Sequence, residues 1–513
     1  DLLKSAYELE APIVGIGIRW WQDYTQQYIN ENGYPYDTFP IENLDFLKDT
    51  GKTITLKIEG KNIVFKIHKV DNFNNVPLYL LDAGHPDSEN GWITDKLYSG
   101  DDRERIAQEI LLGIGGVKAL RTLNINVDKY HFNEGHAAFA GIELIREKME
   151  NENISFEEAL KKTKKEIVFT THTPVAAGNE QHNIDLLKKM GLLEYIPENK
   201  LIEIGGQPFD MTAACLRVSS IANGVSELHQ KTAQDMWKDL DNSAPIISIT
   251  NGVHVKTWQD PLLQKTFDNK GNLWEAHMKK KHELVKYVKE NENAEMNPDN
   301  LIIGFARRAA PYKRGELIFR DTPQIEKYLK NGKLQLIFSG KAHPQDNYGK
   351  DIVATLVKMD QKFKDSVVFL ENYDMEIASY LTRGCDLWLN NPRRPMEASG
   401  TSGMKVAMNG GLNLSVLDGW VAEGVEHDTH GWIFDEVFSE LDETLGEDEK
   451  DLIALYKLIK EEVIPTYYEN KEKWIDMMYA SIEMSQVQFS AKRMLKEYYD
   501  KMYSQKKESV LFK

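Results

Sequence analysis

The feature that most constrains the fold is a regular alternation of short apolar runs with helix-compatible stretches. Strands buried on both faces of a sheet read as continuous apolar runs, and the helices that connect parallel strands fall between them. The sequence therefore predicts an α/β fold with parallel sheets. The predicted strands are Ala11–Ile18, Val127–Phe132, Glu166–Thr171, Ile246–Thr250, Leu301–Phe305, Leu334–Ser339, Val367–Leu370, Asp386–Leu389 and Leu412–Leu417.

The length of 513 residues exceeds what one hydrophobic core supports, so we expect two domains of about 200 residues or more. A charged helical stretch, Trp274–Asn297, precedes the strand at Leu301 and places the hinge near residues 252–262. We therefore predict one domain over 1–252, a second over 253–465, and helices over 466–513 that return to the first domain.

Two local patterns refine this division. Short β segments at residues 51–68 carry two glycines and several charges, which predicts an antiparallel insertion in the first domain. Apolar side chains recur at helical spacing near the end of the chain, and we expect them to pack in a core rather than to bind a cofactor. These are Met477, Met478, Ile482, Met484, Phe489 and Met494.

The charge balance and the two cysteines limit the possible partners. The net charge of −17 disfavours nucleic acids and anionic membranes, so any phosphate-binding residues must be clustered locally. Cys215 and Cys385 lie in apolar surroundings, which argues against a disulfide framework and indicates a reducing cytoplasm. No apolar run has the length of a membrane span, and no signal peptide is recognised.

The most specific motif is the segment 397–405, Glu-Ala-Ser-Gly-Thr-Ser-Gly-Met-Lys. The small residues from Ser399 to Gly403 can turn several N–H groups toward one anion, and the residues after them suit a helix, whose N-terminus favours phosphate. Lys405, one turn inside that helix, is placed for a Schiff base with pyridoxal phosphate. An ordinary helix cap is the alternative interpretation of the same residues.

A group of cations follows the predicted strand Leu301–Phe305. Arg307, Arg308, Lys313 and Arg314 stand at the carboxyl end of this strand, where open α/β sheets bind ligands. Guanidinium and ammonium groups can share one dianion, although a solvated basic face has the same composition.

The segment 397–405 and its continuation through Gly419 resemble the cofactor segment of the glycogen/α-glucan (maltodextrin) phosphorylases. The residues at these positions are most similar to those of the short bacterial and archaeal enzymes. Further matching motifs occur in family order: Asn133–His136, Thr171–Pro174, Asn223–Ser226 with His229, Ile249–His254, Phe305–Arg308 with Tyr312–Arg314, and Glu371–Tyr373. The resemblance implies two Rossmann-like domains facing across a cleft, the GT-B arrangement. It also implies pyridoxal 5'-phosphate on Lys405.

The resemblance assigns a role to each matching residue. It implies that Arg308 and Lys313 grip the substrate phosphate, that Glu397 bonds sugar hydroxyls, and that the main-chain carbonyl of His172 faces the sugar. Residues around the cofactor are then Thr401, Ser402, Arg307, Tyr373 and Trp258. Residues on the sugar side are Asn251, Tyr312, Ser399, Gly400 and His136. Each could instead be a turn, packing or capping residue.

A metal site is not expected. His131, Glu134 and His136 lack the i, i+4 spacing of a helix-borne metal pair. Gly113, Gly115 and Gly116 resemble half of a dinucleotide fingerprint, but they fall within a helical pattern rather than after a strand.

The implied activity is phosphorolysis of α-1,4-glucan from the non-reducing end, giving glucose 1-phosphate with retention. In that mechanism the cofactor phosphate passes a proton to inorganic phosphate. A nucleotide-sugar glucosyltransferase of the same fold is the alternative enzyme, and Lys405 discriminates against it. The family is commonly oligomeric.

The chain begins inside a helical pattern at Asp1, and the family's glycine-rich loop that precedes this helix is not in the sequence. This leaves a catalytically silent glucan-binding protein as a third interpretation. Phosphorolysis by this chain and by one extended with such a segment would separate the cases.

Overall fold

The computed structural model describes residues 1–98 and 100–504. The chain forms two compact units. Of the described residues, the first unit contains Asp1–Tyr24, Phe39–Thr250 and residues 494–504, and the second contains Thr25–Thr38 and Asn251–Arg493. Each unit has its own α/β core.

The first unit contains two four-stranded sheets. One has the order β1-β6-β5-β4, in which β1 is parallel to β6 and the other pairs are antiparallel. The other has the order β12-β11-β8-β7 and is entirely parallel. The strands are β1 Gly15–Ile18, β4 Lys48–Ile58, β5 Lys61–Val70, β6 Leu78–Asp82, β7 Tyr130–Asn133, β8 Ile167–Thr170, β11 Ile221–Gly224 and β12 Ile246–Ser248.

Helices pack around these sheets and bury one continuous core. Several of these helices begin at a capping side chain, as where the Asp101 carboxylate accepts the Glu104 N–H at 3.0 Å. The helices are α1 Leu2–Glu8, α2 Asp102–Ile110, α3 Gly116–Thr122, α4 Ala138–Glu152, α5 Phe156–Lys164, α6 Ile184–Met190, α7 Glu198–Gly205, α8 Met211–Val218 and α9 Glu227–Trp237. A short pair, β9 Gln181–His182 and β10 Phe209–Asp210, lies among them. Gly113 and Gly115 lie in a helical turn between α2 and α3, as their pattern predicted.

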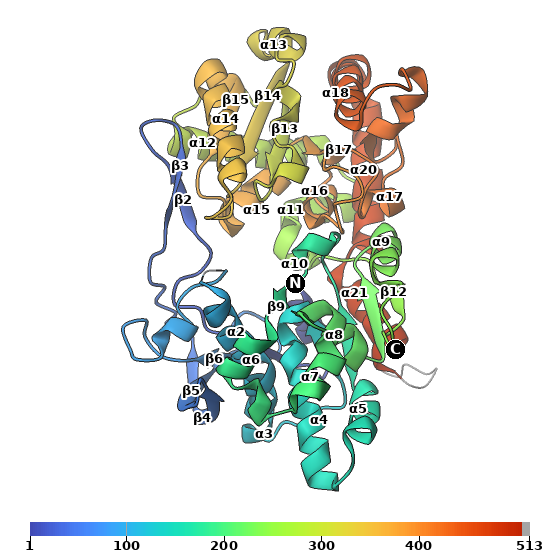
Figure 1. Cartoon of the computed structure of the whole chain (residues 1–513). Coiled ribbons are helices and arrows are strands. Elements are labelled where there is room, and N and C mark those ends of the chain that lie inside the picture. The colour runs from blue at the N-terminus through green and yellow to red at the C-terminus, as the bar shows by residue number, and fades with distance from the viewer. Residues whose placement is uncertain (99, 505–513) are drawn as a thin grey trace. The chain divides into compact units, whose positions relative to one another are not determined.

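The second unit is built on one six-stranded parallel sheet with the order β15-β14-β13-β16-β17-β18 (Figure 1). In chain order this is 3-2-1-4-5-6, the doubly wound order in which ligands bind beyond the carboxyl ends of the strands, where the order reverses. The strands are β13 Leu301–Ala306, β14 Leu334–Ser339, β15 Val367–Leu370, β16 Leu387–Asn390, β17 Leu412–Ser415 and β18 Gly431–Ile433. The reversal falls between β13 and β16.

Helices of the second unit cover this sheet. They are α10 Val255–Trp258, α11 Pro261–Asp268, α12 Leu273–Glu292, α13 Pro323–Lys330, α14 Asn347–Phe363, α15 Met375–Gly384, α16 Thr401–Ala407, α17 Val421–Gly424, α18 Glu447–Leu458, α19 Ile464–Glu469 and α20 Lys471–Gln488; α21 Ala491–Tyr498 follows and runs into the first unit. The strands of the large sheet are buried throughout, which explains their continuous apolar sequences. The prediction of an α/β fold with parallel sheets is confirmed.

The division of the chain differs from the predicted ranges at two places. The hairpin of β2 Gln26–Ile29 and β3 Pro35–Thr38 belongs to the second unit, where it lies beside α14 (Figure 1). Its Gln27 amide exchanges hydrogen bonds with the Ala342 backbone at 3.0 and 3.1 Å, and Asp37 pairs with Lys350 at 2.6 Å. These contacts connect residues far apart in sequence, which periodicity does not reveal.

Residues 466–493 also belong to the second unit, whereas the sequence analysis assigned them to helices returning to the first domain. The physical reason is burial. Trp474, Met477, Met478 and Ile482 of α20 pack in the same core as the large sheet. The prediction that these apolar side chains are core contacts is confirmed, and Cys215 and Cys385 are buried free thiols.

Among the described residues, no helix combines the length and the apolar composition that a bilayer span requires.

Candidate active site

The site of the second unit lies where the strand order reverses. Arg307 and Arg308 follow β13 directly, and Asn390 ends the neighbouring strand β16. The Arg307 guanidinium donates a hydrogen bond to the Asn390 side-chain oxygen, so it bridges the two strands across the reversal. Asn390, which sequence reasoning missed, is therefore part of this site.

Arg307 and Lys313 both bind the Glu397 carboxylate. The Arg307 Nη2 atom lies 2.6 Å from Glu397 Oε2, and Lys313 Nζ lies 2.8 Å from the same oxygen. All three side chains are buried. Burial alone raises the pKa of Glu397, but the two cations outweigh it and hold that pKa below its ordinary value. The structure thus brings together three residues that the sequence analysis assigned to phosphate or sugar.

Arg308 has a different environment from Arg307. Its side chain is exposed, and in the described part of the chain it makes no hydrogen bond or ion pair. Tyr312 is half-buried, and its ring centre lies 4.8 Å from the Lys313 ammonium. Arg308 is therefore available to an anion from solvent.

The segment 397–405 folds as a tight turn that leads into α16. The Glu397 N–H donates to the buried Asp418 carboxylate at 2.9 Å, and Gly400 has a φ of 92°, in the region that favours glycine. No side chain caps this helix. The hydroxyl of Ser399 is buried without a hydrogen-bond partner, whereas Ser402 accepts a bond from the Trp388 indole at 3.1 Å.

Lys405 lies on α16 with an unusual set of neighbours. Its ammonium lies 3.7 Å from the centre of the Trp258 ring, and within the described residues it has no carboxylate partner. Burial lowers its pKa to about 8, because desolvation disfavours the charged amine. The contrast is Lys281, which is fully buried but pairs with Asp386 at 2.5 Å. An amine with these properties is suited to nucleophilic addition to a carbonyl.

One aromatic ring lies against this amine, and a second packs in the same apolar cluster. Trp258 is buried, and Tyr373 is half-buried against the same apolar cluster, which also contains Met404 and Ala407 of α16. Burial raises the pKa of Tyr373 to about 12, so its hydroxyl stays protonated at neutral pH. Asn251 is half-buried in the same unit, and its main-chain carbonyl accepts a bond from Arg493 at 3.1 Å.

Two predicted site residues, His172 and His136, belong to the first unit. His172 follows β8, and its ring nitrogen contacts the Asn133 side chain at 2.8 Å. Its backbone N–H donates to Glu134, which also accepts a bond from the Thr173 hydroxyl at 3.0 Å. Glu134 has φ 69° and ψ 173°, a conformation that non-glycine residues rarely adopt, and such strain gathers at functional sites.

His136 lies among charged side chains. Its Nδ1 atom is 3.4 Å from Glu180 and 3.9 Å from Glu109, and these carboxylates raise its pKa to about 9. The three residues bring one ligand atom each within 4.8 Å of one another, as a metal site would. However, Arg105 already occupies both oxygens of Glu180, at 2.8 and 2.9 Å. A cation would compete with this guanidinium and with the proton of His136, so we interpret the group as an ion-pair network.

Comparisons with known proteins identify the family of this chain. Residues 263–434 match the family described as carbohydrate phosphorylase. The chain is 39% identical to the maltodextrin phosphorylase of Thermococcus litoralis, over 98% of this chain and 67% of that protein. It is 34% identical to the glycogen phosphorylase of Mycobacterium bovis, with the same coverage, and 32% identical to that of Aquifex aeolicus, over 98% of this chain and 82% of the relative. The chain therefore belongs to the carbohydrate phosphorylase family.

Proposed function

We propose that this protein is an α-glucan phosphorylase that uses pyridoxal 5'-phosphate. Its substrates are an α-1,4-glucan, such as maltodextrin, glycogen or starch, and inorganic phosphate. The reaction removes one glucosyl residue from the non-reducing end and yields glucose 1-phosphate with retention of configuration. Family membership supports the reaction class, and the second unit supplies the observation that carries the proposal.

That observation is the environment of Lys405. A half-buried amine that has no carboxylate partner and a pKa near 8 is typical of a functional site, because desolvation without compensation destabilises its charged form. An ordinary helix cap, the alternative interpretation of this segment, has no need of such an amine. Covalent attachment of an aldehyde would explain it, and a nucleotide-sugar glucosyltransferase would not require it.

The surrounding residues fit pyridoxal phosphate. The buried, unpartnered Ser399 hydroxyl lies in the turn before Lys405, and the α16 N-terminus beside it has no side-chain cap. Residues proposed to hold the group are Lys405, Thr401, Ser402, Arg307, Tyr373 and Trp258. When bound, the group would supply a phosphate that exchanges a proton near neutral pH. Trp258 and Tyr373 would exclude water from it.

Arg308 and Lys313 would bind the substrate phosphate, beside Arg307 at the cofactor. Arg307, Arg308 and Lys313 outnumber the single Glu397 carboxylate, so the site keeps a positive charge in a chain that is acidic overall. Arg308 would make the first contact with the phosphate, since its side chain is exposed. The Lys313 ammonium, which pairs with Glu397, would also donate a hydrogen bond to the phosphate.

The sugar would be held by residues of both units. Glu397, Asn251, Tyr312 and the Ser399 and Gly400 N–H groups would bind its hydroxyls from the second unit. His136 and the His172 carbonyl would contribute from the first unit, whose Glu134 holds the turn that carries His172.

The test is the formation of a sugar phosphate. The protein is incubated with pyridoxal phosphate, maltodextrin and inorganic phosphate, and phosphorus NMR follows the products. The proposal predicts α-glucose 1-phosphate with the wild type and none with Lys405→Ala. Transfer from UDP-glucose without a sugar phosphate would identify a glucosyltransferase instead, and maltodextrin binding without turnover would identify a silent glucan-binding protein.

A further inference from the structure

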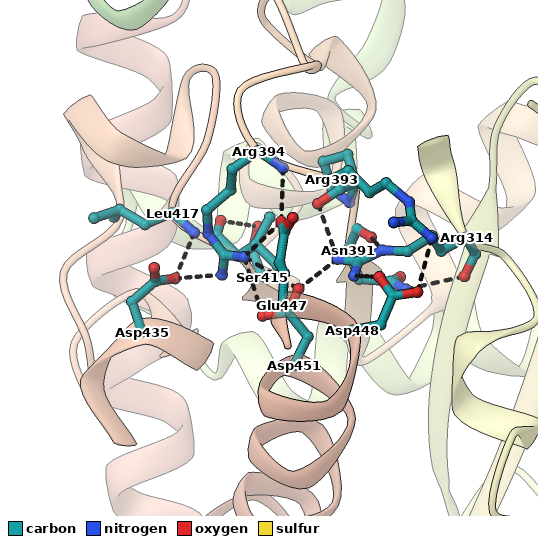
Figure 2. A network of polar contacts seen from close by, with 12 residues as sticks. Arg314, Asn391, Arg393, Arg394, Ser415, Leu417, Asp435, Glu447, Asp448 and Asp451 are labelled. Carbon is teal, nitrogen blue, oxygen red and sulfur yellow. Dashed lines mark hydrogen bonds and ion pairs between the residues drawn. The ribbon is translucent and has the colours of Figure 1, made fainter. Parts of the chain in front are cut away.

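Helix α18 carries two aspartates that bind arginines from both segments of the candidate site. We call Asp448 and Asp451 the acid clamp. One segment is the 311–314 turn, which carries Lys313, and the other is the 391–397 segment, which ends at Glu397. Figure 2 shows the side chains of Arg314 and Arg394 reaching Asp451 from these two segments.

The clamp holds the 311–314 turn through Arg314. This side chain is fully buried, and its guanidinium contacts Asp448 at 2.8 Å and Asp451 at 2.5 Å. The same side chain donates to the main-chain carbonyls of Asn391 at 2.8 Å and Pro392 at 3.0 Å. Arg314 therefore binds the clamp and the second segment at once.

The clamp holds the 391–397 segment through two more arginines. Arg394 contacts both oxygens of Asp451, at 3.0 and 3.1 Å, and Arg393 contacts Asp448 at 2.7 Å. The Arg393 N–H also donates to the Tyr312 carbonyl at 2.8 Å, which joins the two segments directly. Asp451 is itself fully buried, so loss of its charge would leave the buried guanidinium of Arg314 with less compensation.

The position of the clamp connects it to the chemistry. Lys313 immediately precedes Arg314, Glu397 lies three residues beyond Arg394, and their side chains form the 2.8 Å ion pair of the site. We propose that Asp451, with Asp448, is a positioning residue that sets the separation of Lys313 and Glu397 and thereby the affinity of the site for phosphate. This inference rests on the proposed phosphorolysis, because it assigns Lys313 to the phosphate.

The matched variants are Asp451→Asn, which keeps the shape and removes the charge, and Glu449→Gln on the same helix. Glu449 is exposed and accepts a bond only from the Gly446 N–H within the described residues. We expect Asp451→Asn to raise the KM for phosphate about tenfold or more, while the KM for maltodextrin stays within about twofold. Glu449→Gln should leave both unchanged, and both variants should retain cofactor.

A brace that serves only stability would behave differently. It would lower Tm and the amount of active enzyme without changing the KM for phosphate, and that result would overturn the proposal. An equal rise in both KM values would also contradict it. If Asp451→Asn does not fold, Asp448→Asn provides the same test, because Asp448 is partly exposed and its loss leaves Asp451 in place.

Crystal structures of the variants separate this inference from the proposed function. If the wild type forms no glucose 1-phosphate, the proposed function fails, but the geometry remains testable. A Lys313–Glu397 pair that moves beyond hydrogen-bond distance in Asp451→Asn or Asp448→Asn would support the positioning role. A pair that stays intact in both would overturn it, whatever the activity.

Discussion

The Lys405 ammonium lies 3.7 Å from the centre of the Trp258 ring and, within residues 1–98 and 100–504, forms no ion pair. A cation over an indole face is stabilised by the ring quadrupole, but less than it would be by a carboxylate. The amine is therefore held in place without being fixed in its charged form. This relationship makes Lys405 the side chain in the second unit best prepared for covalent chemistry.

The pH dependence of Lys405 follows from burial. Its pKa is lowered from 10.5 to about 8, so the neutral amine is the main form above about pH 8. The rate of modification of Lys405 by an acylating reagent should reach half its maximum near pH 8, measured by peptide mass spectrometry. Exposed lysines such as Lys265 or Lys286 in the same digest serve as controls. The same curve for Lys405 and the controls would contradict the assigned environment.

Removal of Glu397 should have opposite effects on stability and anion binding. Glu397→Gln leaves the buried charges of Arg307 and Lys313 without compensation and should lower the free energy of unfolding by about 3 kcal/mol. The same change should strengthen binding of inorganic phosphate, measured by calorimetry.

The pH profile provides the control for Glu397. The folded state holds the pKa of Glu397 below its ordinary value of 4.5. The stability that the ionised Glu397 contributes is therefore present above pH 4.5 and declines as the pH falls below it. Denaturant unfolding of the wild type and Glu397→Gln should therefore converge in acid. A constant difference at all pH values would show that the charge is not the cause.

Arg308 and Arg307 should differ although they are adjacent. Arg308→Ala removes an exposed side chain without an ion pair in the described structure, so stability should change by no more than about 0.5 kcal/mol. The KM for phosphate should rise about tenfold or more, because a charge-assisted contact is lost. Cofactor should remain bound. Steady-state kinetics over a range of phosphate concentrations check this, and an unchanged KM would remove Arg308 from the phosphate site.

His136 should stabilise the first unit in a pH-dependent manner. The Glu109 and Glu180 carboxylates beside it raise its pKa from 6.5 to about 9, so the stability that charged His136 contributes is complete below pH 6.5 and is lost as the pH rises through about 9. The stability difference between the wild type and His136→Gln should shrink from pH 6 to pH 10 in denaturant unfolding. Glu180→Gln should weaken this dependence, and a difference that grows with pH would contradict the ion-pair network.

The parallel strands were predictable because a strand that is buried on both faces has a continuous run of apolar residues in its sequence. Strand β11 was missed for the opposite reason, since its central Asn223 is polar. In the structure this side chain is buried and accepts a bond from the Thr170 hydroxyl at 2.6 Å, so the sheet tolerates it. A single sequence does not reveal such a partner, which lies on the neighbouring strand.

The site was predictable as a set of residues but not as an arrangement. Lys313 and Glu397 were each assigned to a ligand, and the structure pairs them with one another although 84 positions separate them. Asp451 was not singled out, because the acidic stretch around it resembles the solvated face of a helix. Its burial depends on Arg314 and Arg394, which only the tertiary structure brings to it.

The central claim is covalent attachment of pyridoxal phosphate to Lys405, and borohydride reduction followed by peptide mapping tests it most directly. The purified protein, supplied with pyridoxal phosphate, should show a cofactor absorbance band that borohydride shifts, and the only pyridoxyl-labelled peptide should contain Lys405. The Lys405→Ala protein should retain neither band nor label. Absence of a chromophore after cofactor is added, or a label on another lysine, would contradict the account.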